Sequence, residues 1–219
     1  MAVSYNGTDN NHKISSALGL TDNSEFAFWG RVDSTSEKGL MVALGINTTN
    51  GLAFGVGLDN ADTLGNDVIG VLDGVAWLDS NTAISINTWH FFQLRSNGSN
   101  ATNVWMDGTQ LVNTATNPSA PGANFSIGSG GSTSARFCDC EIAHVIASTL
   151  ATGGTNMAKN GVNPFIAFYS TVTIKGYYPL ANADSTEPDY SLNRNHLTAT
   201  NTPTKFAGNP PVEHIENYL

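Results

Sequence analysis

The segment between residues 89 and 112 constrains the fold of this chain more than any other part of the sequence. Two apolar-rich runs, Trp89-His90-Phe91-Phe92-Gln93-Leu94 and Val104-Trp105-Met106, flank a polar stretch from Arg95 to Asn103. The second run breaks at Asp107-Gly108, a dipeptide that suits tight hairpin turns with positive φ, and resumes as Thr109-Gln110-Leu111-Val112. The segment therefore predicts antiparallel strands, the last two joined by a tight turn.

Short apolar runs of strand length recur along the chain and are punctuated by Gly, Asn and Asp. They show no convincing helical period, and many closely spaced strands are typical of a sandwich or barrel. With 219 residues, the chain is long enough to bury the core of one β-sandwich without division into two domains. Besides residues 89–112, the runs cover residues 25–32, 39–45, 52–58, 68–78, 83–86, 124–128 and 137–147.

Two stretches depart from this strand pattern. Residues 149–161 predict one short helix, which ends at Gly161, a usual helix stop. After Tyr190 the sequence becomes polar and proline-bearing, which predicts an extended segment. We therefore expect a sandwich over residues 1–180 and an extended C-terminal arm over residues 181–219, packed on the sandwich or on a neighbouring subunit. Apolar residues between 165 and 180 complete either their own sandwich or, by chain swapping, a neighbour's.

Charge and cysteine usage narrow the class of protein. The formal net charge of −9 argues against nucleic acid, because such binding depends on Lys and Arg that neutralise phosphates. No apolar run reaches the ~20 residues of a membrane helix. Residues 1–6 lack the basic and apolar parts of a secretory signal, so we expect synthesis in the cytoplasm. Cys138 and Cys140, two apart on a strand, would have Cα atoms about 6.6 Å apart, so we expect thiols and no disulfide.

Several segments, taken together, resemble the laminin-G-like family of concanavalin-A-like lectin domains, in its stand-alone viral and bacterial form. The Trp-His opening and the aromatic-hydrophobic-Asp-Gly turn of residues 89–112 match one strand pair of that family. The opening Tyr5-Asn6-Gly7-Thr8-Asp9 and the late Gly176-Tyr177-Tyr178-Pro179-Leu180 resemble two further family motifs. The remaining matching segments are residues 26–32, 125–128, 140–145 and 189–198.

This resemblance implies a two-sheet antiparallel jelly-roll sandwich whose members mostly bind or build and do not catalyse. The family often holds calcium near an Asp of the late strand, where this chain has Ala143, and it usually has Gly where this chain has Cys140. Because calcium needs six to eight oxygen ligands, the missing carboxylate weakens that site. We expect no cofactor, with calcium at Asp9 and Asn10 as the alternative.

No motif for catalysis is complete. Glucanases of this broad fold use a Glu-x-Asp-x-x-Glu strand, whereas Glu187-Pro188-Asp189 lacks the third Glu and carries a proline that suits a loop. A Gly-x-Ser-x-Gly elbow is absent. His144 would lie roughly 13 Å from Cys140 along a strand, too far to share a zinc ion with it. His90 matches a structural histidine of the family. Because none of these motifs is complete, we expect a protein that is not an enzyme.

Exposed aromatic rings are the remaining candidates for a binding site. Val104 and Met106 share one strand face and leave Trp105 on the other, where its indole either stacks on a sugar or packs under a loop or subunit contact. Tyr190 is a further candidate for exposure. Lectins of this architecture usually place an Asp and an Asn beside such an aromatic. The candidate glycan-binding residues are therefore Trp105, Trp77, Asp59, Asn60, Asp79 and Asn81.

Two functions from different classes follow. We expect first a non-catalytic structural protein, at the surface of a phage-like virion or as its decoration protein, because the low charge and polar arm suit docking to neighbours. Its partners would be protein neighbours in a homo-oligomer or particle, with neither nucleic acid nor membrane. The alternative is a carbohydrate-binding module or lectin that recognises glycans through a rim of Trp, Asn and Asp. A divergent hydrolase is the third hypothesis.

Overall fold

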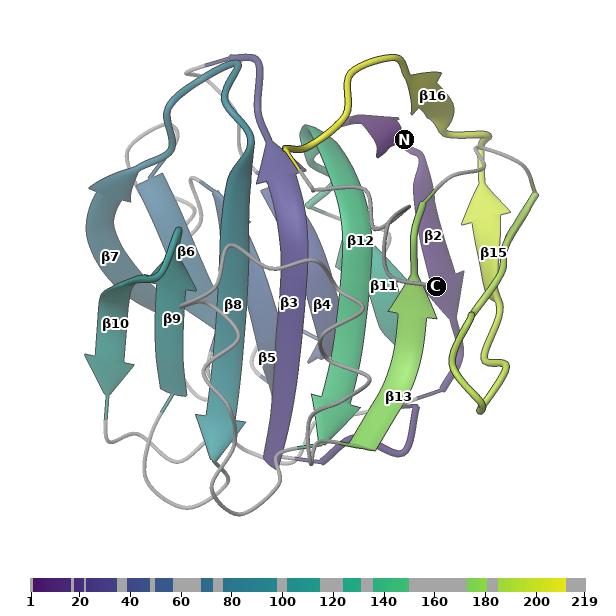
Figure 1. Ribbon diagram of the computed structural model, residues 1–219, viewed down its shortest axis with the longest axis horizontal. Coiled ribbons are helices and arrows are strands. Elements are labelled where there is room, and N and C mark those ends of the chain that lie inside the picture. Colours follow the sequence, from purple (N-terminus) through teal and green to yellow (C-terminus); the bar gives the residue numbers. More distant parts are fainter. Residues whose placement is uncertain are drawn as a thin grey trace, which may run out of the picture.

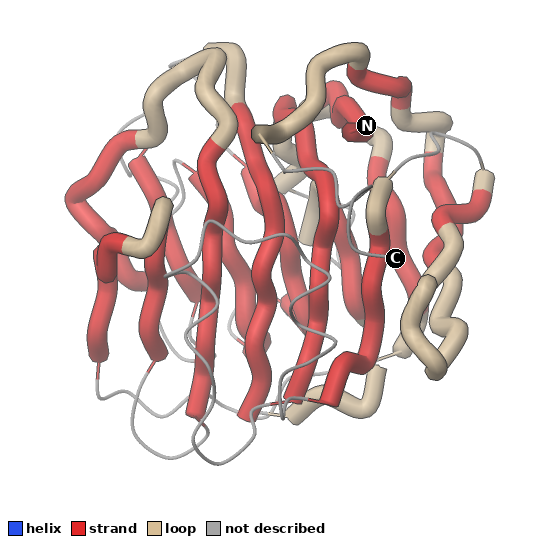
Figure 2. Tube along the Cα trace, in the orientation of Figure 1, coloured by secondary structure: helices blue, strands red, loops and turns tan. Residues whose placement is uncertain are grey.

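The computed structural model describes residues 2–16, 18–21, 23–34, 39–47, 50–56, 68–72, 77–97, 102–114, 124–130, 136–149, 173–180 and 185–211. These residues form strands, turns and loops, and none of them is helical (Figure 2). The strands assemble into two antiparallel sheets that face each other as a sandwich, so the predicted all-β fold is confirmed (Figure 1). The helix expected over residues 149–161 lies outside the described residues, except that Thr149 ends a strand.

The sheet in the foreground of Figure 1, sheet A, has the strand order β10-β9-β8-β3-β12-β1-β16, and β13 also pairs with β12. The strands of sheet A are β1 (Ala2–Asn6), β3 (Asn23–Arg31), β8 (His90–Asn97), β9 (Thr102–Met106), β10 (Thr109–Thr114), β12 (Asp139–Thr149), β13 (Thr173–Tyr178) and β16 (Thr204–Phe206).

The second sheet, sheet B, has the order β14-β15-β2-β11-β4-β5-β6-β7. Its strands are β2 (Asn11–Ile14), β4 (Gly39–Asn47), β5 (Asn50–Val56), β6 (Val68–Leu72), β7 (Trp77–Ala83), β11 (Phe125–Ile127), β14 (Thr186–Glu187) and β15 (Leu197–Thr200).

The hairpin predicted from residues 89–112 forms as expected. β8 pairs with β9, and β9 pairs with β10 across Asp107-Gly108. Both turn residues have positive φ, 50° at Asp107 and 80° at Gly108, which is the backbone of a type I′ turn. His90 Nδ1 lies 2.6 Å from Asp107 Oδ2, and Phe91 N donates to Asp107 Oδ1 at 2.9 Å. The histidine therefore ties the turn to β8 and serves the structure.

The core between the sheets is built around aromatic rings. Phe28 and Phe92 of sheet A enclose Phe54 of sheet B, with ring centroids 5.3 and 4.6 Å from that of Phe54. Phe125 of sheet B stacks on Tyr178 of sheet A at 5.7 Å. All five side chains are fully buried. Because burying one such ring contributes about 1.5–3 kcal/mol, this cluster dominates the attraction between the sheets.

The long strand β12 carries two partners on one edge. β1 pairs with residues 139–142 of β12, and β13 pairs with residues 145–149. Between them, the register of β12 against β3 shifts from Ala143 to Ile146, which marks a bulge. His144 lies at this bulge with a φ of 52°, a left-handed backbone that is uncommon for a residue with a side chain.

The C-terminal segment contributes strands to both sheets. β15 pairs with β2 and β14 pairs with β15 in sheet B, whereas β16 pairs with β1 in sheet A. β13 likewise pairs with β12 of its own chain. Three short strands of the expected arm thus belong to the sandwich, and the division of the chain at residue 180 stays a prediction.

The loop between β14 and β15 covers the outer edge of β13 with side chains. The Lys175 carbonyl accepts hydrogen bonds from Asn195 Nδ2 at 3.2 Å and from Asn193 Nδ2 at 3.4 Å. The amide of Tyr177 donates to Asp189 Oδ1 at 2.9 Å. Open sheet edges invite pairing with other chains, and side chains here satisfy backbone groups of this edge. The alternating polar residues of segment 189–198 are therefore explained by an edge cap.

Candidate functional site

Trp105 lies on the outer face of sheet A, as its position in β9 predicts. Its neighbours Val104 and Met106 point into the core, where Val104 is fully buried. Trp105 is half-buried and pairs with Gln93 of β8 on one side and with Gln110 of β10 on the other. Directly opposed residues share one face of a sheet, so the indole lies between two amide side chains.

The next row along the strands adds a cation and a third amide. Arg95 of β8 is opposite Asn103 of β9, and both side chains are half-buried. Gln110 Nε2 donates to Asn103 Oδ1 at 2.9 Å, which links the two rows. We call the five residues Gln93, Arg95, Asn103, Trp105 and Gln110 the Trp105 face, in which Gln93 is fully buried and supports the others. It combines a flat apolar ring with amides and a guanidinium that donate and accept hydrogen bonds.

A buried carboxyl group lies beside the Trp105 face. Glu25 of β3 is 0% exposed, and its Oε1 accepts a hydrogen bond from Gln93 Nε2 at 2.8 Å. Its Oε2 has no hydrogen-bond partner among the described residues. Burial raises the pKa of Glu25 to about 7, against the opposing effects of the Gln93 hydrogen bond and the Arg95 charge. The protonation of Glu25 near neutral pH therefore bears on how Gln93 is held.

Three of the other predicted glycan-binding residues belong to a strand of the other sheet. Trp77, Asp79 and Asn81 belong to β7 of sheet B, where Asn81 is exposed with a φ of 53°. The side chains of Trp77 and Asp79, and all of Asp59 and Asn60, lie outside the described residues. The residues that surround Trp105 were missed, although their alternation in β8 and β9 was a usable signal.

Asp9 and Asn10, the candidate calcium ligands, belong to a turn that closes after β1. Asn10 Oδ1 accepts a hydrogen bond from the Asn6 amide at 2.8 Å, and Asp9 Oδ1 accepts one from Asn6 Nδ2 at 3.0 Å. Both side-chain oxygens thus stabilise the turn. Among the described residues, no three His, Cys, Asp or Glu side chains are grouped to hold a metal ion.

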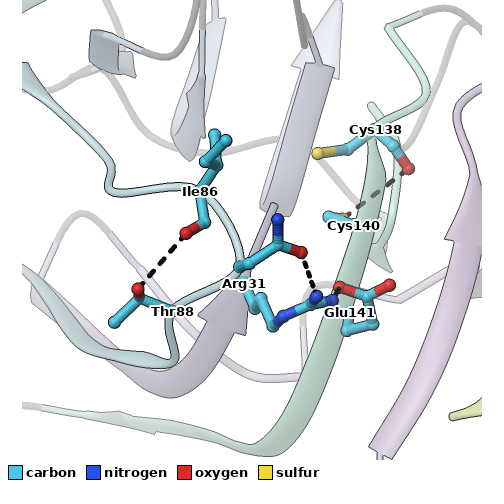
Figure 3. A network of polar contacts seen from close by, with 7 residues as sticks. Arg31, Ile86, Thr88, Cys138, Cys140 and Glu141 are labelled. Atoms are coloured by element: carbon cyan, nitrogen blue, oxygen red, sulfur yellow. Dashed lines mark hydrogen bonds and ion pairs between the residues drawn. The ribbon is translucent and has the colours of Figure 1, made fainter. Parts of the chain in front are cut away.

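A second polar network joins β3, β12 and the turn before β8 (Figure 3). Arg31 Nη1 lies 2.5 Å from Glu141 Oε2, and Arg31 Nη2 donates to Asn87 Oδ1. The guanidinium also lies 5.0 Å from the ring centroid of Phe206 in β16. Burial raises the pKa of Glu141, and the Arg31 contacts oppose that shift. This network joins three strands and is structural.

The two thiols and the contact of His12 with Tyr5 are also structural. Cys138 and Cys140 are buried in the core, and Cys140 Sγ contacts the Cys138 carbonyl at 3.6 Å. His12 Nδ1 lies 2.9 Å from the Tyr5 hydroxyl, which is itself fully buried. In the part of the chain that is described, no helix is long and apolar enough to cross a membrane.

Comparison with known proteins gives similarity of fold. Neither a protein-family model nor a curated protein matches the chain. A Bacteroides ovatus protein considered to bind carbohydrate matches 93% of this chain and 60% of its own, with a TM-score of 0.67 and 18% identity. The chain therefore spans less than two thirds of that protein.

Two further solved structures are similar in fold to this chain. Domain 4 of AbnA, a GH43 extracellular arabinanase of Geobacillus stearothermophilus in complex with arabinotriose, matches 67% of this chain and 69% of its own, with a TM-score of 0.53 and 14% identity. The LG4-5 domains of the mouse laminin α1 chain match 67% of this chain and 41% of their own, with a TM-score of 0.50 and 10% identity. The chain therefore has the lectin-like, concanavalin-A-like jelly-roll fold that its motifs predicted.

Proposed function

We propose that this chain is a non-catalytic carbohydrate-binding domain and that the Trp105 face contacts the sugar. The observation that carries the proposal is the half-buried indole of Trp105, flanked by amide side chains on the outer face of an eight-stranded sheet. An indole offers a flat apolar surface to the C–H face of a sugar, and its enclosure by neighbouring strands limits its motion. Rigid contact groups lose little entropy on binding.

The groups around the indole suit the hydroxyls of a sugar. Gln110 and Asn103 are joined by a hydrogen bond, which holds the two amide groups in place beside the indole. Arg95 supplies a planar fork of N–H donors beside them. Such convergent polar groups around an apolar contact are the usual composition of a small-ligand site.

Two of the similar structures support this function by their own descriptions. The Bacteroides ovatus protein is considered to bind carbohydrate, and the arabinanase domain was solved with arabinotriose. These similarities favour carbohydrate binding over the particle-surface role that the sequence suggested first. Incorporation into a virion and assembly into a homo-oligomer stay predictions, which light scattering on the intact chain would test. A truncation after Leu197 is unsuitable, because it removes β16 and most of β15.

Two buried carboxyl groups on the outer face of sheet A, Glu25 and Glu141, do not form a glycosidase pair with each other. Glu25 and Glu141 both lie on its outer face, opposite Ser148 and Arg31 of the neighbouring strands. Glu141 is opposite Arg31 of β3, and Arg31 is six residues from Glu25 on the same strand. Glu141 and Glu25 are therefore about 20 Å apart along the strand direction. Glycosidases place their two carboxyl groups about 5–9.5 Å apart. This pair is therefore too far apart for glycoside hydrolysis.

Affinity electrophoresis and calorimetry test the proposal. The probes are arabinan, xylan, mixed-linkage β-glucan and polygalacturonate, each with and without calcium. We expect at least one to bind, and Trp105→Ala to weaken its binding by about tenfold or more while the protein stays folded. Trp105→Phe should retain part of the affinity, because a smaller ring still stacks. As a control, Trp89→Ala removes an indole that packs against Phe206, and it should leave binding unchanged. Unaltered binding by Trp105→Ala, or no binding to any glycan of a broad array, would refute the proposal.

A further inference from the structure

A second exposed aromatic ring lies at the other side of sheet A. Tyr190 follows β14 and is 60% exposed, one of three large hydrophobic side chains at the surface of the described residues. Its amide donates to the Tyr177 carbonyl at 2.9 Å, and its ring meets that of Tyr177 edge-on, with centroids 6.5 Å apart. The ring of Tyr190 is thus attached to the outer face of β13 and still open to solvent.

The backbone on both sides of Tyr190 is held by one carboxylate. Asp189 is buried, and it accepts hydrogen bonds from the amides of Tyr177, Ser191 and Asn195 at 2.7–2.9 Å and from the Ser191 hydroxyl at 2.8 Å. The Asp189 amide in turn donates to His196 Nδ1 at 3.0 Å. A loop fixed by this many contacts presents its exposed ring in one orientation, which lowers the entropy lost on binding.

The bulge in β12 supplies a third ring and a polar edge. His144 stacks on Tyr177 at 6.4 Å with an angle of 14° between the rings, and its Nδ1 lies 3.1 Å from the Tyr177 hydroxyl. The positive φ of His144 costs on the order of 1–3 kcal/mol, and strain of this kind is concentrated at functional sites. The backbone at this bulge therefore brings the imidazole against Tyr177.

The charge around this cluster differs from that of the whole chain. The chain carries a net charge of −9. Among the described residues 173–180 and 185–211, however, both carboxylates, Glu187 and Asp189, are buried and hydrogen-bonded. Arg194 and His196 of the same loop are exposed. These two segments therefore present no exposed carboxylate among their described residues to a neutral or acidic sugar.

We infer that Tyr190, supported by Tyr177 and His144, forms a second saccharide-binding site, separate from the Trp105 face. The inference rests on the proposed function and extends it to a bivalent domain. The exposed Tyr190 ring stacks on one face of a sugar ring, while the buried Tyr177 ring, with His144 stacked on it, holds it in place. The Tyr177 plane lies 63° from that of Tyr190 and 14° from that of His144, and the three rings form a preorganised platform for an aromatic contact.

The sheet register separates the two sites. One row of paired residues crosses sheet A from Trp105 of β9 to Tyr177 of β13, through Gln93, Ala27 and Ile146. Four strand spacings, or ~19 Å, therefore separate Trp105 from Tyr177. Ala27 and Ile146 in the middle of the row are buried. The two rings therefore belong to two sites and not to one continuous groove, and a long glycan that reaches both gains avidity without any new contact.

Calorimetry on the intact chain and five variants tests the inference. The probes are arabinan, xylan, mixed-linkage β-glucan and polygalacturonate, each with its own trisaccharide. Tyr190→Ala should lower the stoichiometry of the bound trisaccharide from two to one and weaken polymer binding by about tenfold. Tyr190→Phe should bind like the wild type, because the ring stacks without its hydroxyl. Trp105→Ala should keep residual binding, and the double variant Trp105→Ala/Tyr190→Ala should lose it.

Leu192→Ala is the matched control, because Leu192 is fully exposed on the same loop and has no ring. It should leave both stoichiometry and affinity unchanged. If Trp105→Ala removes all binding and Tyr190→Ala removes none, the second site does not exist, although the proposed function stands. If the wild type binds no probe, both fail. If Tyr190→Ala and Leu192→Ala abolish self-association in light scattering and leave glycan binding intact, the surface binds protein and the inference is wrong.

Discussion

The buried carboxyl of Glu25 makes the stability of this protein depend on pH in an unusual direction. Because the folded pKa of about 7 lies above the unfolded value of about 4.5, the folded protein holds the proton more tightly. The stabilisation by this proton is complete below about pH 4.5 and is lost as the pH rises through about 7. The difference between the two pKa values corresponds to about 3 kcal/mol of unfolding free energy.

Glu25→Gln removes this titration and keeps the shape of the side chain. The amide can still hydrogen-bond to Gln93, and it carries no charge to be buried. We expect the stability of the variant relative to the wild type to rise by up to about 3 kcal/mol between pH 5 and pH 8. Urea unfolding followed by tryptophan fluorescence at four pH values in that range measures the difference directly.

Asp107→Asn is the control for this comparison. Hydrogen bonds from His90 and the Phe91 amide lower the pKa of Asp107 despite its partial burial, so it does not titrate between pH 5 and pH 8. Its variant retains Glu25 and should therefore retain the fall in stability that Glu25 causes between pH 5 and pH 8. If the stability of Glu25→Gln falls with pH in parallel with that of the wild type, Glu25 is not a buried neutral acid. The reasoning from its burial is then refuted.

Three further changes probe the fold. Asp107→Asn should cost about 1 kcal/mol of unfolding free energy at pH 7, after allowance for solvent screening. We expect the wild type to lose stability below about pH 4, as Asp107 is protonated and loses its bond with His90, and the variant to lose less. Thermal unfolding at pH 3–7 measures both effects. Asp189→Asn should cost about 2–4 kcal/mol in urea unfolding, because an amide nitrogen cannot accept two of the four hydrogen bonds. Gly128→Ala should cost about 3 kcal/mol or more, because the new Cβ would lie 2.5 Å from Tyr5 Cδ1 at a φ of +84°.

Each of these changes has an informative opposite result. If Asp107→Asn loses as much stability at low pH as the wild type does, another carboxylate governs acid unfolding. Asp189→Asn with wild-type stability would show that the edge of β13 does not need its cap. Gly19→Ala is the control for Gly128, since Gly19 also has a positive φ, +68°, but its Cβ would meet only Lys175 Nζ at 3.9 Å. It should cost about 1 kcal/mol, the strain alone.

Local patterns predicted a large part of the fold and one element of the site. The type I′ turn at Asp107-Gly108 and the outward position of Trp105 both follow from residues within a few positions of each other. The neighbours of Trp105 on β8 and β10 depend on strand register, which no local pattern states. Trp77 and Asp79 were grouped with Trp105 because they are aromatic and polar, yet they belong to the other sheet.

Much of the remaining structure depends on pairing between distant segments. Gln93 and Glu25 are 68 residues apart in the chain, and only the pairing of β3 with β8 brings their side chains together. The bulge at His144 arises where β12 must pair with β1 and β13 on the same edge. The asparagines and Asp189 in segment 189–198 looked like a family motif, and their role as an edge cap appeared only once β13 lay beside them.

The sequence by itself therefore determined the strand pattern, the tight turn and the side of the sheet on which Trp105 lies, because alternation and turn chemistry act between near neighbours. The tertiary structure alone decided which amides surround Trp105, why Glu25 holds its proton near pH 7, and how Tyr190, Tyr177 and His144 meet. These features require surfaces from separate strands to come together, and the burial of the aromatic core between the two sheets sets that arrangement.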